Sequence, residues 1–372
     1  MKIVFIITGL SVGGAETVLL RLLQRINRSR FSVHVVSLGS MGVLGSSIEE
    51  LGIPVTALGM TPGKLSIPLF IRLVSLLRKI RPDIVQTWMY HADVLGGAAA
   101  YLAGVRRILW NIRVVRPGSR TTTAVMKMCA PLSYIIPRKI LACAEAVRRS
   151  HCAQGYCSRK MQVLPNGVDT EFFHPNNSAR AAFRRKLGIH NTTPLVGYVG
   201  RFHPNKNIPN FLKHAVSRVL QNNSAAHVAL IGSELTHDNL VLQQAMSDFP
   251  HERVHLLGPH NAIAAAMSAF DVLALPSHIE GFPNVLLEAM ACGVPSVATS
   301  TGDSAIIIGN LGRIVEVGDM EGLANSIIEI LALPEQERQD IGIKARERIV
   351  KEYDIKTMIH KYEKIYESVY TE

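Results

Sequence analysis

The sequence is poor in cysteine and has no long apolar run, and both shortages narrow the classes of protein it can encode. Its five cysteines in 372 residues are odd in number and irregularly spaced, and no CxxC pair occurs. Reduced, buried thiols in the cytoplasm fit this usage better than a disulfide framework or a zinc site. No run reaches the roughly 18 apolar residues that a membrane-spanning helix needs. We therefore expect a cytoplasmic protein, either soluble or peripheral on the inner face of the cytoplasmic membrane.

Acidic residues are scarce in the middle of the first half. From Arg106 to Lys160 there are twelve basic residues against Glu145 alone, within a net charge of +11. Such a stretch attracts nucleic acid, anionic lipid or a phosphorylated acceptor, or is simply a solvated basic surface. We do not expect nucleic acid as a partner, because no recognised binding motif or interleaved aromatic set accompanies the charge.

Length and composition predict two globular domains. The chain has 48% apolar and 19% charged residues, and its length exceeds one ordinary core. Its apolar start, MKIVFIITG, is interpreted as the first core strand rather than as a signal peptide. Strands and helices alternate on both sides of a turn-rich segment at 163–175, which predicts two parallel sheets. We expect one domain over 1–164, a second over 165–352, and a final amphipathic helix over 353–372.

Apolar runs and helical periodicity place the individual elements. Strands are expected at 2–8, 32–38, 55–58, 84–87, 108–112, 140–144, 195–199, 227–232, 254–257, 272–275 and 295–298. Helices are expected at 17–26, 67–80, 91–104, 121–131, 177–188, 208–220, 284–292, 319–331, 335–351 and 353–370. The alternation predicts the α/β class with doubly wound sheets.

Two acidic residues flank the start of a short helix in the second half. Glu280 lies in the loop after the strand 272–275, and Glu288 lies on the helix that Pro283 opens as its first residue. A buried unpaired charge is costly, so Glu288 faces either solvent or a site that supplies hydrogen-bond donors. The helix start favours phosphate. The pattern suits a nucleotide sugar, with its diphosphate at the helix end and a hydroxylated ring on each side.

Two cations follow the first strand of the second half. Arg201 and Lys206 come directly after the strand 195–199, at the edge where parallel sheets place their ligands. A planar guanidinium and an ammonium there can grip a diphosphate without a metal. The alternative, for a basic loop considered by itself, is that Arg201 and Lys206 are simply solvated at the surface.

The first half offers weaker signals at the corresponding edge. Gly13 and Gly14 form a glycine-bearing turn after the first strand, but their spacing is not the dinucleotide fingerprint, which disfavours a nicotinamide dehydrogenase. They either let a ligand approach the backbone or only make a tight turn. His91 either contacts the donor sugar or acceptor, or caps a helix. Arg113 either meets phosphate or is a surface arginine.

Four motifs together carry a resemblance to a known family. EGFPNVLLEAMACGVPSVAT over 280–299, GGAE over 13–16, PNGVDTEFF over 165–173 and GRFHPNKN over 200–207 resemble family 4 (group 1) retaining glycosyltransferases. The resemblance spans essentially the whole chain and identifies the family, but not the sugar. It implies the GT-B fold, in which two Rossmann-like, doubly wound domains face each other across a cleft and the C-terminal helix packs back on the first domain.

The resemblance also implies an activity and a set of site residues. The expected reaction is a retaining transfer from a nucleoside diphosphate sugar, UDP in preference, to a glycan or lipid-linked acceptor in cell-surface polysaccharide biosynthesis, with no metal or cofactor. The first domain would serve the acceptor and the second the donor. Arg201, Lys206 and Glu280 are expected to be catalytic, and Gly13, Gly14, His91, Arg113, Gly281, Phe282, Asn284, Val285 and Glu288 to bind substrate.

One departure from the family pattern limits the transfer of roles. Many members carry a histidine near Arg113 that contacts the donor sugar, whereas this chain has WNIR over 110–113. We therefore do not assign the role of that histidine to His91.

The helix over 67–80 and the basic region after Arg106 are expected to contact an anionic membrane. The alternatives to a transferase are a nucleotide-sugar epimerase of the same fold and a non-catalytic sugar-nucleotide-binding subunit of a polysaccharide assembly.

Overall fold

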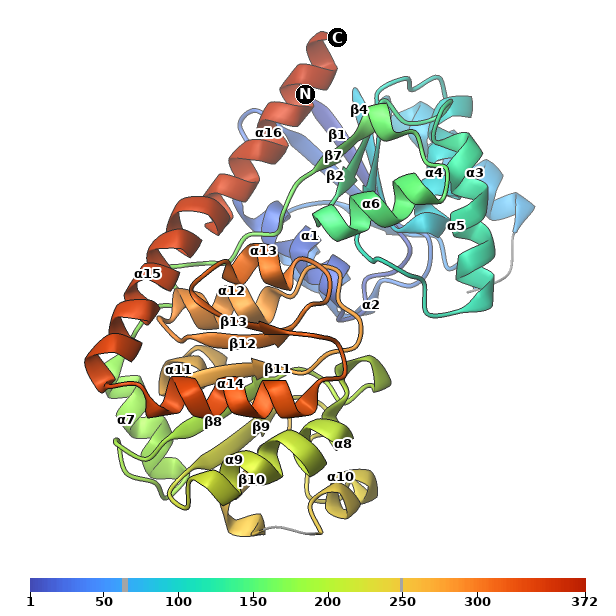
Figure 1. Cartoon of the computed structure of the whole chain (residues 1–372). Helices are drawn as coiled ribbons and strands as arrows, with labels where there is room; N and C mark the ends of the chain where they lie inside the picture. The colour runs from blue at the N-terminus through green and yellow to red at the C-terminus, as the bar shows by residue number, and fades with distance from the viewer. Residues whose placement is uncertain (62–65, 248–249) are drawn as a thin grey trace. The chain divides into compact units, whose positions relative to one another are not determined.

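The computed structural model describes residues 1–61, 66–247 and 250–372, which divide into two compact units. Unit 1 comprises Met1–Asn166 and Lys356–Glu372, and unit 2 comprises Gly167–Ile355. Each unit is built on one parallel sheet with helices packed on both faces (Figure 1). The predicted α/β class with two doubly wound, Rossmann-like domains is thereby confirmed.

The described strands of unit 1 form a seven-stranded parallel sheet in the order β3-β2-β1-β4-β5-β6-β7. They are β1 (Lys2–Ile7), β2 (Ser32–Ser37), β3 (Val55–Ala57), β4 (Ile84–Trp88), β5 (Ile108–Ile112), β6 (Lys139–Ala142) and β7 (Met161–Val163). Its helices are α1 (Gly14–Arg25), α2 (Gly42–Glu50), α3 (Ile67–Ile80), α4 (Tyr90–Leu102), α5 (Arg120–Leu132), α6 (Glu145–Ala153) and α16 (Ile355–Thr371). The strand order reverses between β1 and β4, which is the point where doubly wound sheets bind ligands.

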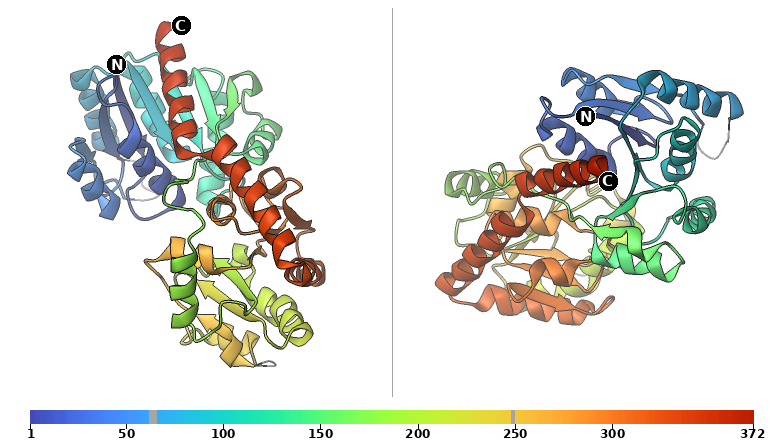
Figure 2. Two further views of the ribbon diagram at one scale, coloured as in Figure 1. Left: turned by 90° about the vertical axis from the view of Figure 1, so that its left-hand side faces the viewer. Right: turned by 90° about the horizontal axis from the view of Figure 1, so that it is seen from above.

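Neighbouring residues of β4 point to opposite faces of this sheet, and a different helix covers each face. A Cβ at Gly96 of α4 would lie 3.2 Å from the side chain of Thr87, so α4 approaches that face closely. On the other face the hydroxyl of Tyr366 in α16 donates to Gln86 Oε1 at 2.5 Å. Figure 2 shows α16 lying across the strands of the sheet. The last helix therefore supplies a hydrogen-bond donor to Gln86, a polar residue in a fully buried strand.

The described strands of unit 2 form a six-stranded parallel sheet in the order β10-β9-β8-β11-β12-β13. They are β8 (Leu195–Val199), β9 (His227–Ile231), β10 (Val254–Leu256), β11 (Val272–Leu275), β12 (Ser296–Thr299) and β13 (Gly312–Val315). Its helices are α7 (Asn177–Lys186), α8 (Ile208–Asn210), α9 (Ser217–Asn222), α10 (Leu240–Ala245), α11 (Ile263–Ala269), α12 (Asn284–Ala291), α13 (Ser304–Ile308), α14 (Met320–Ala332) and α15 (Glu335–Tyr353). Here the order reverses between β8 and β11.

Several boundaries differ from those expected. The helix predicted over 208–220 contains a π-helical segment at Phe211–Val216, which periodicity alone does not reveal. Tyr353 ends α15 rather than opening the last helix, because Asp354 is extended and forms a bridge with Val168. The two units accordingly divide after Asn166 and before Lys356, close to the expected 164 and 353. The elements α2, α6, α10, α11, α13, β7 and β13 were not predicted, and all are short.

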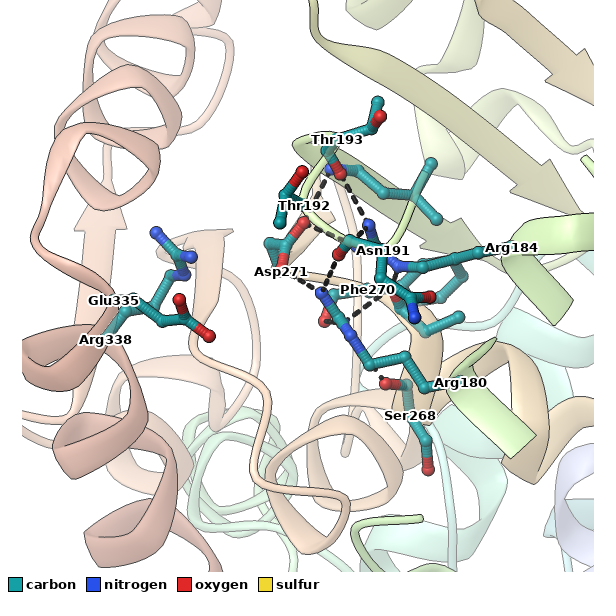
Figure 3. A network of polar contacts seen from close by, with 12 residues as sticks. Arg180, Arg184, Asn191, Thr192, Thr193, Ser268, Phe270, Asp271, Glu335 and Arg338 are labelled. Atoms are coloured by element: carbon teal, nitrogen blue, oxygen red, sulfur yellow. Dashed lines mark hydrogen bonds and ion pairs between the residues drawn. The ribbon is translucent and has the colours of Figure 1, made fainter. Parts of the chain in front are cut away.

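A buried arginine network holds α7 against the amino-terminal edge of the unit 2 sheet (Figure 3). Arg184 is fully buried and donates to Asp271 Oδ2 at 2.6 Å and to the carbonyl oxygen of Thr193 at 2.6 Å. Arg180 donates to Asp271 Oδ1 at 2.7 Å, and the backbone N–H of Leu195 donates to Asp271 Oδ2 at 2.8 Å. Because Asp271 directly precedes β11, the network ties the starts of β8 and β11 to one helix.

A cavity of about 850 Å³ opens beside this network, between α7, the turn before β12 and one side of α15. Its lining includes Arg180, Asn191, Arg338 and Arg346, and it does not include Arg201, Lys206, Glu280 or Glu288. The cavity lies at the amino-terminal edge of the sheet, whereas doubly wound sheets bind ligands at the carboxyl edge. None of the described helices is long and apolar enough to cross a membrane.

Candidate functional site

The strand order of unit 2 brings two of the predicted site residues into contact. Lys206 lies in a short 3₁₀ turn (Pro204–Lys206) after β8, and Glu280 lies in the loop after β11, the strand paired with β8. The Lys206 Nζ and Glu280 Oε1 atoms are 2.5 Å apart, with the side chains 22% and 11% exposed. The contact stands at the carboxyl edge where the strand order reverses, which is the ligand-binding position of this architecture.

The loop that carries Glu280 is anchored on both sides. Ser277 Oγ donates to Glu280 Oε1 at 2.7 Å, and the Ser277 carbonyl oxygen accepts from Thr299 Oγ1 of β12 at 2.6 Å. The backbone N–H of His278 donates to the carbonyl oxygen of Asn205 at 2.7 Å. The carboxylate is therefore held by its own loop, by β12 and by the turn that carries Lys206.

Two glycines allow the backbone segments of this edge to meet. A Cβ at Gly302, whose φ is +55°, would lie 2.3 Å from the carbonyl oxygen of Gly281. A Cβ at Gly232, whose φ is +151°, would lie 1.9 Å from the carbonyl oxygen of Gly200, the residue before Arg201. Only glycine tolerates these conformations and contacts, so both positions support the loops that carry the charged side chains.

The helix α12 presents its apolar side chains to the core and leaves Glu288 half-buried. Leu286 and Leu287 are fully buried, as expected for the packing face. Pro283 is the extended N-cap residue rather than the first helical residue. The Phe282 ring is buried, with its centroid 6.0 Å from that of Tyr353. Any ligand contact of Phe282 would therefore be made by its backbone, because its ring packs in the core of unit 2.

Arg201 is exposed at the same edge, and beneath it lies a residue that the sequence did not single out. Tyr198 is fully buried, and its hydroxyl has no hydrogen-bond partner among the described residues. A Cβ at Gly200 would lie 2.6 Å from that hydroxyl oxygen. Burial raises the pKa of Tyr198, the negative charge of Glu280 raises it further, and the positive charge of Arg201 lowers it.

Ser277 and Tyr198 are the site residues that sequence reasoning missed. Ser277 stands three residues before Glu280, and Tyr198 interrupts an otherwise aliphatic strand, LVGYV. A polar group at the carboxyl end of a buried strand was the available signal for both.

In unit 1 the glycine turn lies against a carboxylate. A Cβ at Gly13 would lie 2.4 Å from Glu16 Oε2, so the Glu16 side chain folds back over the start of α1. Burial raises the pKa of Glu16, while its backbone hydrogen bond and the charge of Arg113 lower it. Glu16 belongs to the GGAE motif but was not assigned a role from the sequence.

The predicted residues of unit 1 follow neighbouring strands, but Arg113 already has partners. Its guanidinium contacts Asn166 Oδ1, lies 3.5 Å from Asn111 Oδ1 and stands 5.3 Å from the ring centroid of Trp88. It is 9% exposed, so the alternative of a surface arginine is wrong. A contact between Arg113 and phosphate remains a prediction.

His91 follows the strand β4, which neighbours both β1 and β5. It is the second residue of α4, and Met89 is the N-cap, so the alternative of a helix-capping histidine is wrong. Its side chain is half-buried, and burial lowers its pKa. A neutral imidazole in this position can accept or donate a hydrogen bond. Its predicted contact with substrate remains a prediction.

Two family models match this chain, one mainly over unit 1 and the other within unit 2. Residues 12–172 match the description Glycosyltransferase Family 4, and residues 193–333 match Glycosyl transferases group 1. Among the described residues, no group of three or more His, Cys, Asp or Glu side chains is placed to hold a metal ion.

Relatives that match over most of their length are also named as glycosyltransferases. The chain is 24% identical to the UDP-Gal:alpha-D-GlcNAc-diphosphoundecaprenol alpha-1,3-galactosyltransferase of Escherichia coli, with 95% of this chain and 94% of the relative covered. It is also 24% identical to the capsular polysaccharide biosynthesis glycosyltransferase CapM of Staphylococcus aureus, with 92% of each covered. The putative glycosyltransferase EpsF of Bacillus subtilis is 26% identical over 81% of this chain and 79% of its own length.

Solved structures agree on the fold. The Anabaena protein HepE in complex with UDP matches with a TM-score of 0.87 and 23% identity, covering 99% of this chain and 100% of HepE. HepE in complex with UDP-glucose matches with a TM-score of 0.85 and 24% identity over 99% and 100% of the two chains.

Proposed function

This chain belongs to the family 4, group 1 glycosyltransferases of the GT-B fold, and we propose that it transfers a hexose or N-acetylhexosamine from a UDP-sugar to a lipid-linked or polysaccharide acceptor with retention of configuration. Relatives named for a diphosphoundecaprenol acceptor and for capsular polysaccharide support this acceptor class. A HepE structure that holds UDP-glucose supports the choice of nucleotide.

The observation that carries the proposal is the contact of Lys206 with Glu280 at the carboxyl edge of the unit 2 sheet. An ammonium and the nearby guanidinium of Arg201 neutralise the charge that develops on a departing diphosphate, and such electrostatic stabilisation is usually the largest part of catalysis. Glu280 accepts hydrogen bonds from the hydroxyls of the donor sugar. Glu288, half-buried on α12, does the same for the ribose.

The proposed chemical step is a single exchange at the anomeric carbon. The bond from that carbon to the diphosphate oxygen breaks, and a bond to the acceptor oxygen forms on the same face. The departing diphosphate takes the acceptor proton. Arg201 and Lys206 hold the diphosphate throughout, and the sugar stays on Glu280. In unit 1, Gly13, Gly14, His91 and Arg113 are the residues proposed to contact the donor or the acceptor.

A nucleotide screen followed by product analysis tests the proposal. Melting temperatures are compared with UDP, GDP, ADP and dTDP and with their hexose conjugates, because a ligand that binds only the folded state raises the melting temperature. The stabilising donor is then incubated with a diphospholipid-linked acceptor, and the anomeric proton of the product is read by NMR. Inversion of configuration would contradict retention. Conversion of the donor without acceptor would indicate an epimerase, and binding without turnover would indicate a non-catalytic subunit.

We also propose that unit 1 contacts an anionic membrane through the outer side of α3, α4 and α5, here called the α3–α5 face (Figure 1). The exposed apolar side chains of these helices and of the turns that follow them are Ile67, Ile71, Tyr101, Leu102, Met128, Tyr134 and Ile135, and the exposed cations are Arg72, Arg78, Lys79, Arg106 and Lys127. The described residues of these three helices include one acidic residue, Asp93, and its side chain is fully buried. Apolar side chains flanked by cations fit the surface of an anionic bilayer.

Flotation with liposomes tests the contact. Wild-type protein should float with vesicles that contain phosphatidylglycerol and sediment with purely zwitterionic vesicles. A variant with Arg72→Glu, Arg78→Glu and Lys79→Glu should lose flotation, because each basic residue near an anionic surface contributes about 1 kcal/mol. The control carries Arg185→Glu and Lys186→Glu on the exposed side of α7. Equal recovery with both kinds of vesicle, or equal loss in both variants, would contradict the proposal.

A further inference from the structure

We propose that Ser277 is a positioning residue for recognition of the donor sugar. Its hydroxyl fixes one oxygen of Glu280, so that the other oxygen addresses the hydroxyls of the sugar. The inference rests on the proposed function, since it presupposes that Glu280 contacts the donor sugar.

The two oxygens of Glu280 have different surroundings. Oε1 accepts from Ser277 Oγ at 2.7 Å and from Lys206 Nζ at 2.5 Å. Within residues 1–61, 66–247 and 250–372, Oε2 takes no hydrogen bond. The Glu280 side chain is 11% exposed, so one face of an otherwise enclosed carboxylate remains accessible. An accessible carboxylate oxygen accepts hydrogen bonds from whatever donor reaches it, and a sugar hydroxyl is such a donor.

Ser277 is well placed to keep this orientation. It is fully buried in the loop two residues after β11, and its carbonyl oxygen is held by Thr299 Oγ1 of β12 at 2.6 Å. Its side chain has a single torsion between the backbone and the hydroxyl oxygen, so little freedom remains. A hydrogen bond between this hydroxyl and an ionised carboxylate belongs to the stronger class.

Lys206 cannot replace Ser277 in this role. Its ammonium stands on a flexible four-carbon stem and has several N–H donors, so it can keep Glu280 or turn toward a diphosphate. When the donor binds, the diphosphate competes with Glu280 for the ammonium. Ser277 has no such competing ligand, and it therefore holds the carboxylate while Lys206 serves the leaving group.

The test separates binding of the sugar from binding of the nucleotide. Dissociation constants for UDP, UDP-galactose, UDP-glucose and UDP-N-acetylglucosamine are measured by calorimetry for wild type and for Ser277→Ala. The variant should bind the preferred UDP-sugar about tenfold more weakly, the effect of one hydrogen bond to a charged group. Its affinity for UDP should change by less than about twofold, because Lys206 and Glu288 remain. A serine that only supported the fold would lower both affinities together.

The matched control is Ser296→Ala. Ser296 is likewise a fully buried serine and lies in β12 of the unit 2 sheet, and its hydroxyl lies 3.5 Å from the Val294 carbonyl oxygen, with no hydrogen bond to Glu280. This variant should retain the wild-type ratio of the two affinities. An unchanged ratio in Ser277→Ala, or a parallel loss of UDP and UDP-sugar, would overturn the inference.

Glu280→Gln distinguishes the inference from the function on which it rests. If Glu280→Gln loses preference for the UDP-sugar over UDP and Ser277→Ala does not, only the role of Ser277 fails. If Glu280→Gln keeps the wild-type preference, Glu280 does not bind the sugar, and the proposed site fails together with the inference. Absence of binding of all four ligands to wild type would overturn both.

Discussion

The ammonium of Lys206 and the carboxylate of Glu280 lie 2.5 Å apart, although 74 positions separate the two residues in the sequence. Their strands β8 and β11 are neighbours in the sheet, so the loops that follow them begin side by side. A cation and an anion at such an edge serve different parts of one ligand in the proposed reaction. The substitutions below separate these contributions from one another and from the stability of the fold.

Replacing Lys206 should remove a charge that the leaving diphosphate needs. Lys206→Ala is expected to lower the rate of sugar transfer about a hundredfold. It also leaves Glu280, with its side chain 11% exposed, without its cation. The measurement is initial velocity with the donor found in the nucleotide screen. Lys213→Ala, an exposed lysine of the following helical segment, is the control and should keep wild-type velocity. Full activity in Lys206→Ala would remove Lys206 from the site.

Replacing Glu288 should weaken every ligand that contains the ribose. Glu288→Ala is expected to lower transfer about a hundredfold. Unlike Ser277→Ala, it should weaken UDP and UDP-sugar in parallel, because both contain the ribose. Calorimetry with both ligands provides the measurement. Glu321→Ala, whose side chain is 70% exposed on α14, is the control. Loss of sugar preference with unchanged UDP affinity would place Glu288 on the sugar instead.

Removing the hydroxyl of Tyr198 should stabilise the protein. That hydroxyl is buried without a hydrogen-bond partner among the described residues, and such a group costs about 1–3 kcal/mol. Tyr198→Phe is therefore expected to raise the free energy of unfolding by about 1 kcal/mol. Tyr156→Phe is the matched control of opposite sign, because its hydroxyl donates to the Met126 carbonyl oxygen at 2.8 Å. Urea denaturation of both variants checks the prediction, which fails if Tyr198→Phe is the less stable of the two.

Breaking the network around Asp271 should destabilise unit 2 strongly. Arg184 is fully buried, and its loss removes one of the two cations paired with Asp271 and the hydrogen bond to the Thr193 carbonyl oxygen. Arg184→Ala is expected to cost about 3–5 kcal/mol, the usual effect of removing one partner of a buried ion pair. Arg185→Ala, the exposed neighbour on α7, should change stability by less than about 0.5 kcal/mol. The denaturant midpoint is the measurement, and equal midpoints for the two variants would contradict the structural role.

The histidine pair of β9 and β10 should make stability fall in mild acid. His227 Nδ1 and His255 Nε2 are 3.0 Å apart. Burial lowers the pKa of His255 to about 4, with the charges of His227 and His237 acting in the same direction. The ordinary pKa of histidine is 6.5, so between these values the unfolded chain binds more protons than the folded one. Stability is therefore full above pH 6.5 and is lost progressively as the pH falls toward 4.

Denaturant midpoints at pH 7.5 and pH 5.0 measure this loss, the two values being chosen to span most of the interval over which His255 titrates. In His255→Asn the difference between the two midpoints should be smaller than in wild type. His214→Asn, at an exposed position, should keep the wild-type difference. A wild-type difference in His255→Asn would show that the pair does not contribute.

Periodicity and motif spacing were sufficient for much of the fold. The buried strands at 2–7, 108–112, 195–199 and 272–275 are short apolar runs bounded by turn residues, and alternation with helices leaves a doubly wound parallel sheet as the solution. The short elements α10, α13 and β13 were not predicted, because a few residues without clear periodicity carry too weak a signal. The π-helical segment within the predicted helix 208–220 was not predicted for a different reason, because its apolar residues follow the same pattern as those of an α-helix.

The local sequence pattern did not predict which polar side chains are buried or which residues they pair with. Gln86 in β4 is paired by Tyr366 from the last helix, and Arg113 is covered by Asn166 and Trp88, partners distant along the chain. No window of sequence contains both members of such a pair. The contacts that bury Arg113 are therefore visible only in the folded unit, and the contact of Arg113 with phosphate remains a prediction.

The sequence by itself determined which charged residues follow which strands, because strand ends and glycine turns are local features. Only the tertiary structure decided that β8 and β11 are neighbours, and hence that Lys206, Ser277 and Glu280 form one hydrogen-bonded group. The physical reason is that strand order is set by packing over the whole sheet. A hydrogen bond requires its two atoms within about 3 Å, a condition that residue spacing along the chain does not express.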